Sequence, residues 1–123
     1  MKAILCLLLL VATMTYADTQ LQLNMTADQA FKASDSQLNT LYKEMLGKYD
    51  QQNKALLIAS ERAWITYRDA ECKFETAPFS QGSIYPMYYA QCLTDKTNQR
   101  IVELKSQLNC KEGDPCNLGD MSS

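Results

Sequence analysis

Apolar residues recur at three- and four-residue steps through the first third of the chain after residue 25. This stripe runs through Phe31, Ser34, Leu38, Leu41, Met45 and Tyr49. Such spacing places side chains on one face of a helix. Thr26 and Gln29 form the capping-box pattern just before the stripe, so we predict a helix over about 26–49.

A second stripe follows the polar residues 50–53. Its apolar face carries Leu56, Leu57, Ser60, Ala63, Trp64, Tyr67, Ala70 and Phe74. Because neither proline nor glycine interrupts positions 54–76, we predict a helix of about six turns there.

Pro78, Gly82 and Pro86 mark the long loop of the chain, at about 77–85. Pro86 suits a first helical turn, so a third helix is expected over about 86–109. Its stripe runs through Tyr89, Cys92 or Leu93, Lys96 or Thr97, Arg100 or Ile101, Leu104 and Leu108. No segment shows β-type alternation. The expected fold is therefore all-α, a small three-helix bundle with up-down-up topology.

The first 17 residues have the pattern of a secretory signal peptide. Lys2 precedes an apolar run from Ile4 to Ala12, and small residues occupy Thr15 and Ala17 before the polar Asp18. We expect cleavage after residue 17, with an uncleaved anchor as the alternative. The mature chain would comprise a polar leader over 18–25, a helical domain over 26–110 and a flexible tail over 111–123.

Composition narrows the classes of function. The chain of 123 residues has no histidine, which excludes His-dependent catalytic triads and His-ligated metals. Removing residues 1–17 leaves 11 basic and 14 acidic residues, a charge of −3. A nucleic-acid binder would normally show a basic excess. We expect no cofactor, no metal, no nucleic-acid partner and no membrane insertion after cleavage.

Four cysteines remain in the mature chain, an even number typical of disulfides in an exported protein. An antiparallel pair of helices joined by the 77–85 loop would bring Cys72 beside Cys92, so we predict that bridge. Cys110–Cys116 follows by elimination and would close a small ring in the tail. Free or intermolecular thiols at the tail are the alternative. Disulfides place the protein in an oxidising compartment, the periplasm or the medium.

The densest run of aromatic and charged residues includes Trp64, Tyr67, Arg68 and Asp69. Trp64 and Arg68 lie four residues apart, so the guanidinium can lie over the indole ring. The favoured interpretation is a buried polar clamp that sets helix register. The alternative is a recognition site in which Arg68 binds a partner's carboxylate.

Two further groups have open interpretations. Glu71 and Glu75 lie one turn apart and could form a general acid/base pair, although such pairs are usually solvated. Tyr85, Tyr88 and Tyr89 are either an end cap of the bundle or an exposed contact patch, because tyrosine is common at interfaces.

The arrangement of these residues resembles the family of LprI-type lysozyme inhibitors. The resemblance begins at 35–42, is sharpest in the run from Arg62 to Cys72, and continues through the Gly82-Ser83 loop, Cys92 and the segment 97–104. It implies a small α-helical domain whose paired cysteines are Cys72 and Cys92. It also implies that this protein is secreted or periplasmic, that its partner is a protein, a lysozyme, and that it is not an enzyme.

A lysozyme inhibitor needs a protruding, stiff element that enters the cleft of its target. The loop after the second helix fits this need, because the predicted disulfide brackets it. The candidate partner-binding residues are Phe79, Ser80, Gln81, Gly82, Ser83, Tyr85 and Tyr88. The rival hypothesis is an envelope protein-interaction domain that uses the tyrosines or the outer face of the first helix.

Overall fold

The structure is a computed structural model that describes the backbone of residues 2–110 and 114, and the side chains of 19–110 and 114. Three α-helices make up this part of the chain: α1 (Lys2–Lys48), α2 (Gln51–Thr76) and α3 (Tyr85–Leu108). A short 3-10 helix, η1 (Ala77–Phe79), follows α2 directly. The described residues contain no strand, so the predicted all-α three-helix fold is confirmed.

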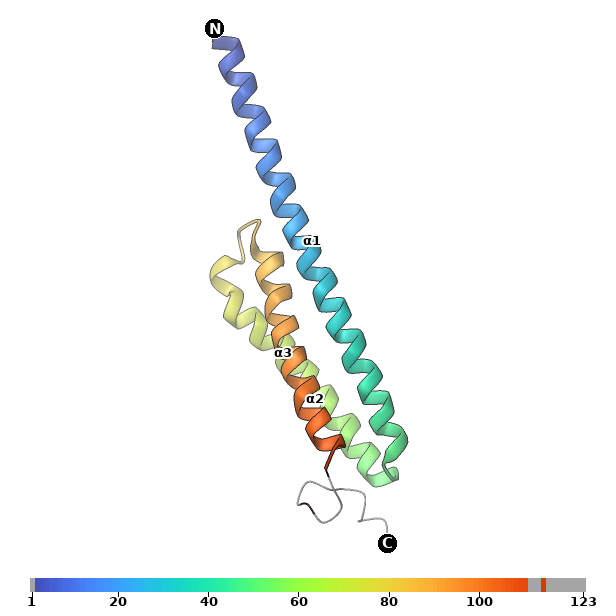
Figure 1. Cartoon of the computed structure of the whole chain (residues 1–123). Helices are drawn as coiled ribbons and strands as arrows, with labels where there is room; N and C mark the ends of the chain where they lie inside the picture. Colours follow the sequence, from blue (N-terminus) through green and yellow to red (C-terminus); the bar gives the residue numbers. More distant parts are fainter. Residues whose placement is uncertain (1, 111–113, 115–123) are drawn as a thin grey trace.

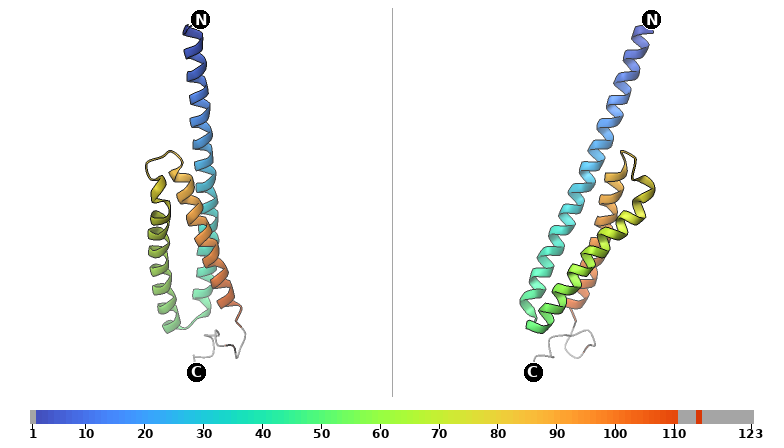
Figure 2. Two further views of the ribbon diagram at one scale, coloured as in Figure 1. Left: turned by 90° about the vertical axis from the view of Figure 1, so that its left-hand side faces the viewer. Right: turned by 180° about the vertical axis from the view of Figure 1, so that it is seen from behind.

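The helices run up, down and up, so α1 and α3 are parallel and α2 is antiparallel to both (Figure 1). Helix α3 packs against both other helices, and more extensively against α1 than against α2. The amino-terminal part of α1 projects well beyond the hairpin formed by α2 and α3, as all three views show (Figure 2).

Helix α1 begins far earlier than the predicted residue 26. The predicted leader over 18–25 is helical, and the Thr26 hydroxyl donates to the Gln22 carbonyl at 3.0 Å, inside the helix. The capping-box interpretation of Thr26 is therefore wrong. Neither proline nor glycine occurs between Lys2 and Leu46, so nothing in the backbone chemistry stops the helix before Thr26.

Helix α2 begins at Gln51, three residues before the predicted start. The Asp50 carboxylate accepts the backbone N–H of Asn53 at 2.8 Å, which is the geometry of an N-cap. Asp50 also ends the turn from α1, so α1 and α2 are joined by only two residues.

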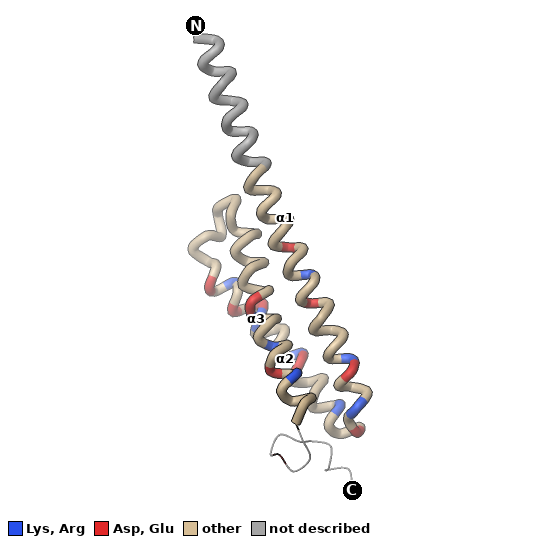
Figure 3. Tube along the Cα trace, viewed as in Figure 1, with Lys and Arg blue, Asp and Glu red and all other residues tan. Residues whose placement is uncertain are grey.

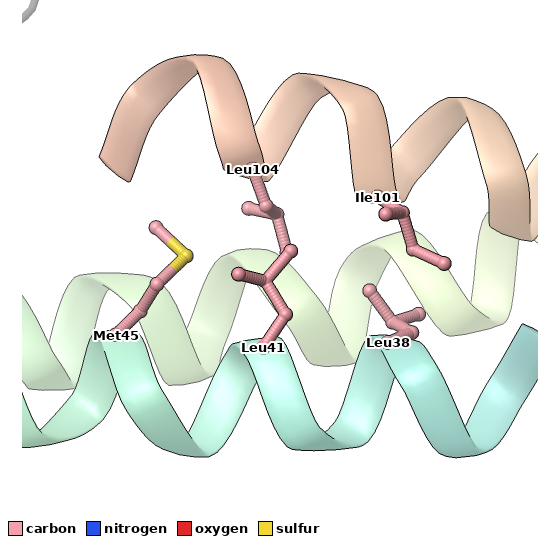
Figure 4. Close-up of a cluster of buried hydrophobic side chains, with 5 residues drawn as sticks. All are labelled: Leu38, Leu41, Met45, Ile101 and Leu104. Atoms are coloured by element: carbon pink, nitrogen blue, oxygen red, sulfur yellow. The ribbon is translucent and has the colours of Figure 1, made fainter. Parts of the chain in front are cut away.

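The hydrophobic core lies between α1 and α3. Leu38, Leu41 and Met45 of α1 face Ile101 and Leu104 of α3, and all five are buried (Figure 4). The stripe predicted for the first helix is thus the buried one. In the third helix, the structure selects Leu93, Thr97 and Ile101 from the alternatives that the sequence left open.

Helix α2 buries only part of the face that its apolar stripe predicts. Leu56, Tyr67 and Phe74 are 61%, 56% and 75% exposed. The residues of α2 that are buried instead are Glu61, Arg68, Cys72 and Thr76. Leu57 and Trp64 of the predicted apolar face are partly buried against the core, so the prediction is right for these two side chains and wrong for the exposed ones. Polar side chains with partners on α1 and α3 decide which side of α2 turns inward.

Candidate functional site

The connection between α2 and α3 is a series of tight turns rather than an open loop. The N–H of Ser80 donates to the Ala77 carbonyl at 3.1 Å, and that of Gly82 donates to Phe79 at 3.0 Å. The N–H of Tyr85 then donates to the Gly82 carbonyl at 3.2 Å, where α3 begins. These three hydrogen bonds order the backbone of the connection, which forms the tip of the hairpin (Figure 1).

Two pairs of aromatic rings pack together at the base of this tip. The rings of Phe79 and Tyr88 lie 4.6 Å apart between centroids, and those of Tyr85 and Tyr89 are stacked at 5.7 Å. All three tyrosines are half-buried, while Phe79 is exposed. Burial raises the pKa of the Tyr89 hydroxyl, and Asp69 and Tyr85 act in the same direction against Arg68. The tyrosines therefore pack as an end cap and still leave part of each ring accessible.

The tip itself is polar and exposed. Ser80, Gln81, Gly82 and Ser83 are all exposed. A methyl group added at Gly82 would lie 3.5 Å from the Phe79 carbonyl oxygen, an ordinary contact. The tip therefore does not depend on glycine at this position.

A side chain of α1 also holds the tip. The amide nitrogen of Asn24 donates to the Ser83 carbonyl at 2.9 Å, and Gln20 donates to the Asn24 side-chain oxygen at 2.9 Å. Sequence reasoning assigned these residues to a leader of uncertain structure and missed this contact. No periodic signal could have revealed it, since Asn24 and Ser83 are 59 positions apart.

The predicted Cys72–Cys92 disulfide is confirmed. It connects α2 to α3 at the base of the tip. The two Cα atoms lie 5.7 Å apart, and Cys72 is fully buried. Next to the bridge, Lys96 forms an ion pair with Glu75 at 2.9 Å, which links α3 to α2 a second time. The hydrogen bond from Lys96 to Glu75 raises the pKa of Lys96, and desolvation by burial opposes it. The predicted Cys110–Cys116 bridge involves Cys116, which lies outside the described residues.

Arg68 lies inside the bundle, where three groups occupy its guanidinium. It donates to the carboxylates of Asp69 at 2.9 Å and Asp35 at 3.4 Å, and to the Thr97 hydroxyl at 3.3 Å. The side chain is only 8% exposed. This geometry favours the polar clamp over a recognition site for an external carboxylate, because Arg68 connects all three helices.

Trp64 lies between two guanidinium groups. Those of Arg68 and Arg100 are 5.2 and 5.7 Å from a Trp64 ring centroid, within the range of a cation–π contact. Arg100 also binds the buried Glu61 carboxylate through two nitrogens, at 3.1 and 3.2 Å. In the part of the chain that the structure describes, every buried side-chain nitrogen and oxygen has a partner. The buried charges of Arg68, Arg100 and Glu61 are therefore paired with charges of opposite sign.

These features offer no evident chemistry for catalysis. Glu75, half of the alternative acid/base pair with Glu71, is in the ion pair with Lys96. Among the described residues, no group of three or more cysteine, aspartate or glutamate side chains could hold a metal ion. Among residues 19–110, no helix is both long and apolar enough to cross a membrane.

A family model described as "Lysozyme inhibitor LprI" matches residues 11–104. The chain belongs to this family. The match covers the disulfide, the tip and the Arg68 clamp, so the resemblance noted in the sequence is confirmed. It ends before Cys110, which leaves the tail outside the family pattern.

One curated relative of this LprI-family chain is an uncharacterized protein of Rhizobium meliloti (strain 1021). It is 32% identical over 109 residues, which span 78% of this chain and 78% of the relative. No solved structure matches the chain.

Proposed function

We propose that this protein is a non-catalytic inhibitor of lysozyme that blocks the catalytic cleft with the tip of the α2–α3 hairpin. Membership of the LprI family supports the choice of partner. The observation that carries the proposal is the tip itself. It is exposed and polar, and the Cys72–Cys92 bridge holds its base.

The chemistry of the tip suits a glycosidase cleft. Lysozyme uses two acidic side chains, one of them ionised, on either side of the bond that it cleaves. Ser80, Gln81 and Ser83 offer hydrogen-bond donors, and no acidic residue occurs between Thr76 and Thr94 to repel those carboxylates. A donor that is neutral also costs less to desolvate than lysine or arginine would.

Rigidity of the tip favours tight binding. An inhibitor that is already ordered does not lose conformational entropy when it enters a cleft. The consecutive turns, the aromatic pairs and the disulfide order the tip in the free protein. Export through the amino-terminal signal peptide would bring the protein to an oxidising compartment, where the disulfide persists.

The proposal is tested by mixing the purified protein with chicken-type lysozyme and a cell-wall substrate. We expect lysis to slow at micromolar excess and a complex to form. Gln81→Glu should weaken inhibition, because it places a carboxylate beside those of the cleft. Gln52→Glu is the matched control, since Gln52 is exposed at the opposite end of the bundle. Unchanged lysis without any complex would refute the proposal.

The rival function, an envelope interaction domain, is favoured by one observation. Tyr67 and Phe74 lie two turns apart on α2, outside the tip, and are 56% and 75% exposed. Under this alternative, Phe74→Ser would abolish binding to an envelope protein, and lysis by lysozyme would proceed unchanged.

A further inference from the structure

Two stretches at one end of the bundle contain no charged side chain. Residues 19–27 of α1 and residues 76–94, which span the tip and the first turns of α3, contain no lysine, arginine, aspartate or glutamate. These two stretches lie at the same end of the described structure, and the charged residues gather over the rest of it (Figure 3). We call these two stretches the uncharged end.

The α1 part of the uncharged end exposes large apolar side chains. Leu21, Leu23 and Met25 are 58%, 47% and 49% exposed, whereas the equivalent length of α1 further along presents mainly polar groups to solvent. Leu23 also lines a mainly apolar groove of about 270 Å³, whose other wall includes Met87, Gln91 and, at its edge, the charged Asp95 of α3. Through this groove, the exposed apolar surface of α1 continues onto α3.

Asn24 ties this surface to the tip. Its side chain bonds to Ser83 at 2.9 Å, so the exposed apolar residues on either side of it keep a set position relative to the tip. A partner that receives the tip in its cleft would therefore meet α1 with little further ordering.

The size of a stable interface indicates that the tip is not sufficient alone. Specific complexes bury about 800 Å² per partner and involve about 20–30 residues a side. The tip, residues 79–85, is too small for this. The cores of protein interfaces are poor in charge and rich in tyrosine, phenylalanine and methionine. Residues 76–94 contain all three types, and residues 19–27 add Met25 and no charge.

We propose that residues 19–27 of α1 form a second contact surface for the same partner, a lysozyme, and pack against it beside the cleft while the tip enters the cleft. This inference rests on the proposed function. It extends the binding surface to a segment that the loop hypothesis does not include. A lipid surface or a second copy of this chain is the competing occupant.

The test uses the full chain, exported and recovered from the periplasm of an expressing bacterium, with its intact mass recorded. Leu23→Asp and Leu23→Arg each place a charge in the proposed contact. Val102→Asp is the matched control, because Val102 is 67% exposed on α3 beyond the uncharged end. Circular dichroism and thermal midpoints verify that all variants fold. The variants at Leu23 should fold, because this side chain already lies partly in water.

We expect both Leu23 variants to raise the Kd for chicken-type lysozyme at least about tenfold, since a buried unpaired charge opposes binding whatever its sign. Val102→Asp should stay within about twofold. If the unmodified protein inhibits lysozyme and Gln81→Glu weakens it, but the Leu23 variants bind normally, the tip acts alone and this inference is overturned. If the unmodified protein does not bind lysozyme, both proposals fail. Leu23-dependent binding to phospholipid vesicles, or Leu23-dependent dimerisation, would then identify the other occupant.

Discussion

The side-chain amide of Asn24 donates a hydrogen bond to the backbone carbonyl of Ser83, at 2.9 Å. This contact joins the middle of α1 to the turn between α2 and α3, although the two residues are far apart in sequence. Through it, α1 does more than contribute to the core, because it also sets the position of the hairpin tip.

Removing the Asn24 side chain should loosen the tip without unfolding the bundle. Asn24→Ala removes one hydrogen bond with a net worth of about 1 kcal/mol, so the tip should open about fivefold more often. Hydrogen exchange of the Gly82 and Tyr85 amides, which close the turns, measures this opening. Asn39→Ala is the control, because Asn39 is exposed on the same helix away from the tip. Equal exchange in both variants would show that Asn24 does not hold the tip.

Loss of the Cys72–Cys92 disulfide should lower stability. The bridge closes a loop with a sequence separation of 20 residues, which corresponds to roughly 3 kcal/mol in the chain-entropy description. Cys72→Ala with Cys92→Ala should lower the free energy of unfolding by about this amount, as measured by urea denaturation. Inhibition of lysozyme should weaken as well, since the base of the tip is no longer closed. An unfolding free energy equal to that of the unmodified protein would contradict the prediction.

Arg68 should be essential for stability and not for direct recognition. Arg68→Ala leaves Asp35 and Asp69 without their cation and removes the stacking on Trp64. Because both carboxylates are partly exposed, we expect a loss of about 2–4 kcal/mol, toward the lower side of values for buried pairs. Arg62→Ala, at an exposed position of the same helix, should change the unfolding free energy by less than about 0.5 kcal/mol. Equal effects in denaturant titrations would argue against the clamp.

Stability should fall at alkaline pH. The folded-state pKa of Lys96 is raised by its hydrogen bond to Glu75, and those of Tyr49 and Tyr89 are raised chiefly by burial. Each group therefore holds its proton more tightly in the folded state. The resulting stability is complete below the unfolded pKa values, about 10, and is lost as the pH rises through the folded ones.

The measurement is the urea midpoint between about pH 8 and pH 11.5, the range over which these groups titrate. Tyr49→Phe should flatten the alkaline decline, because it removes one of the three groups. Tyr42→Phe, seven residues earlier in α1, is the control. A midpoint that stays constant across this range would contradict the prediction.

The predicted helices and the disulfide were correct where local pattern and spacing decide the outcome. The stripe from Leu38 to Met45 repeats with helical period and faces the core. Cys72 and Cys92 meet because an antiparallel hairpin with a short turn leaves little choice of register. The start of α1 was mistaken, since Thr26 looks like a cap and instead bonds back to Gln22 within a continuous helix.

The candidate site was predicted only in part. Ser80, Gln81 and Ser83 were identified because proline and glycine mark the turn in which they lie. The contribution of α1 through Asn24 was missed, because it depends on how two distant segments meet.

The sequence by itself determined the all-α class, the three helices, the buried stripe of α1 and the pairing of Cys72 with Cys92. Only the tertiary structure decided which face α2 buries and which segments form the uncharged end. Periodicity reports how side chains are arranged around one helix, but burial depends on the partners that the other helices supply. Arg68 turns inward because its guanidinium binds Asp35 and Thr97 inside the bundle. Phe74 has no such partner among the described residues and remains 75% exposed.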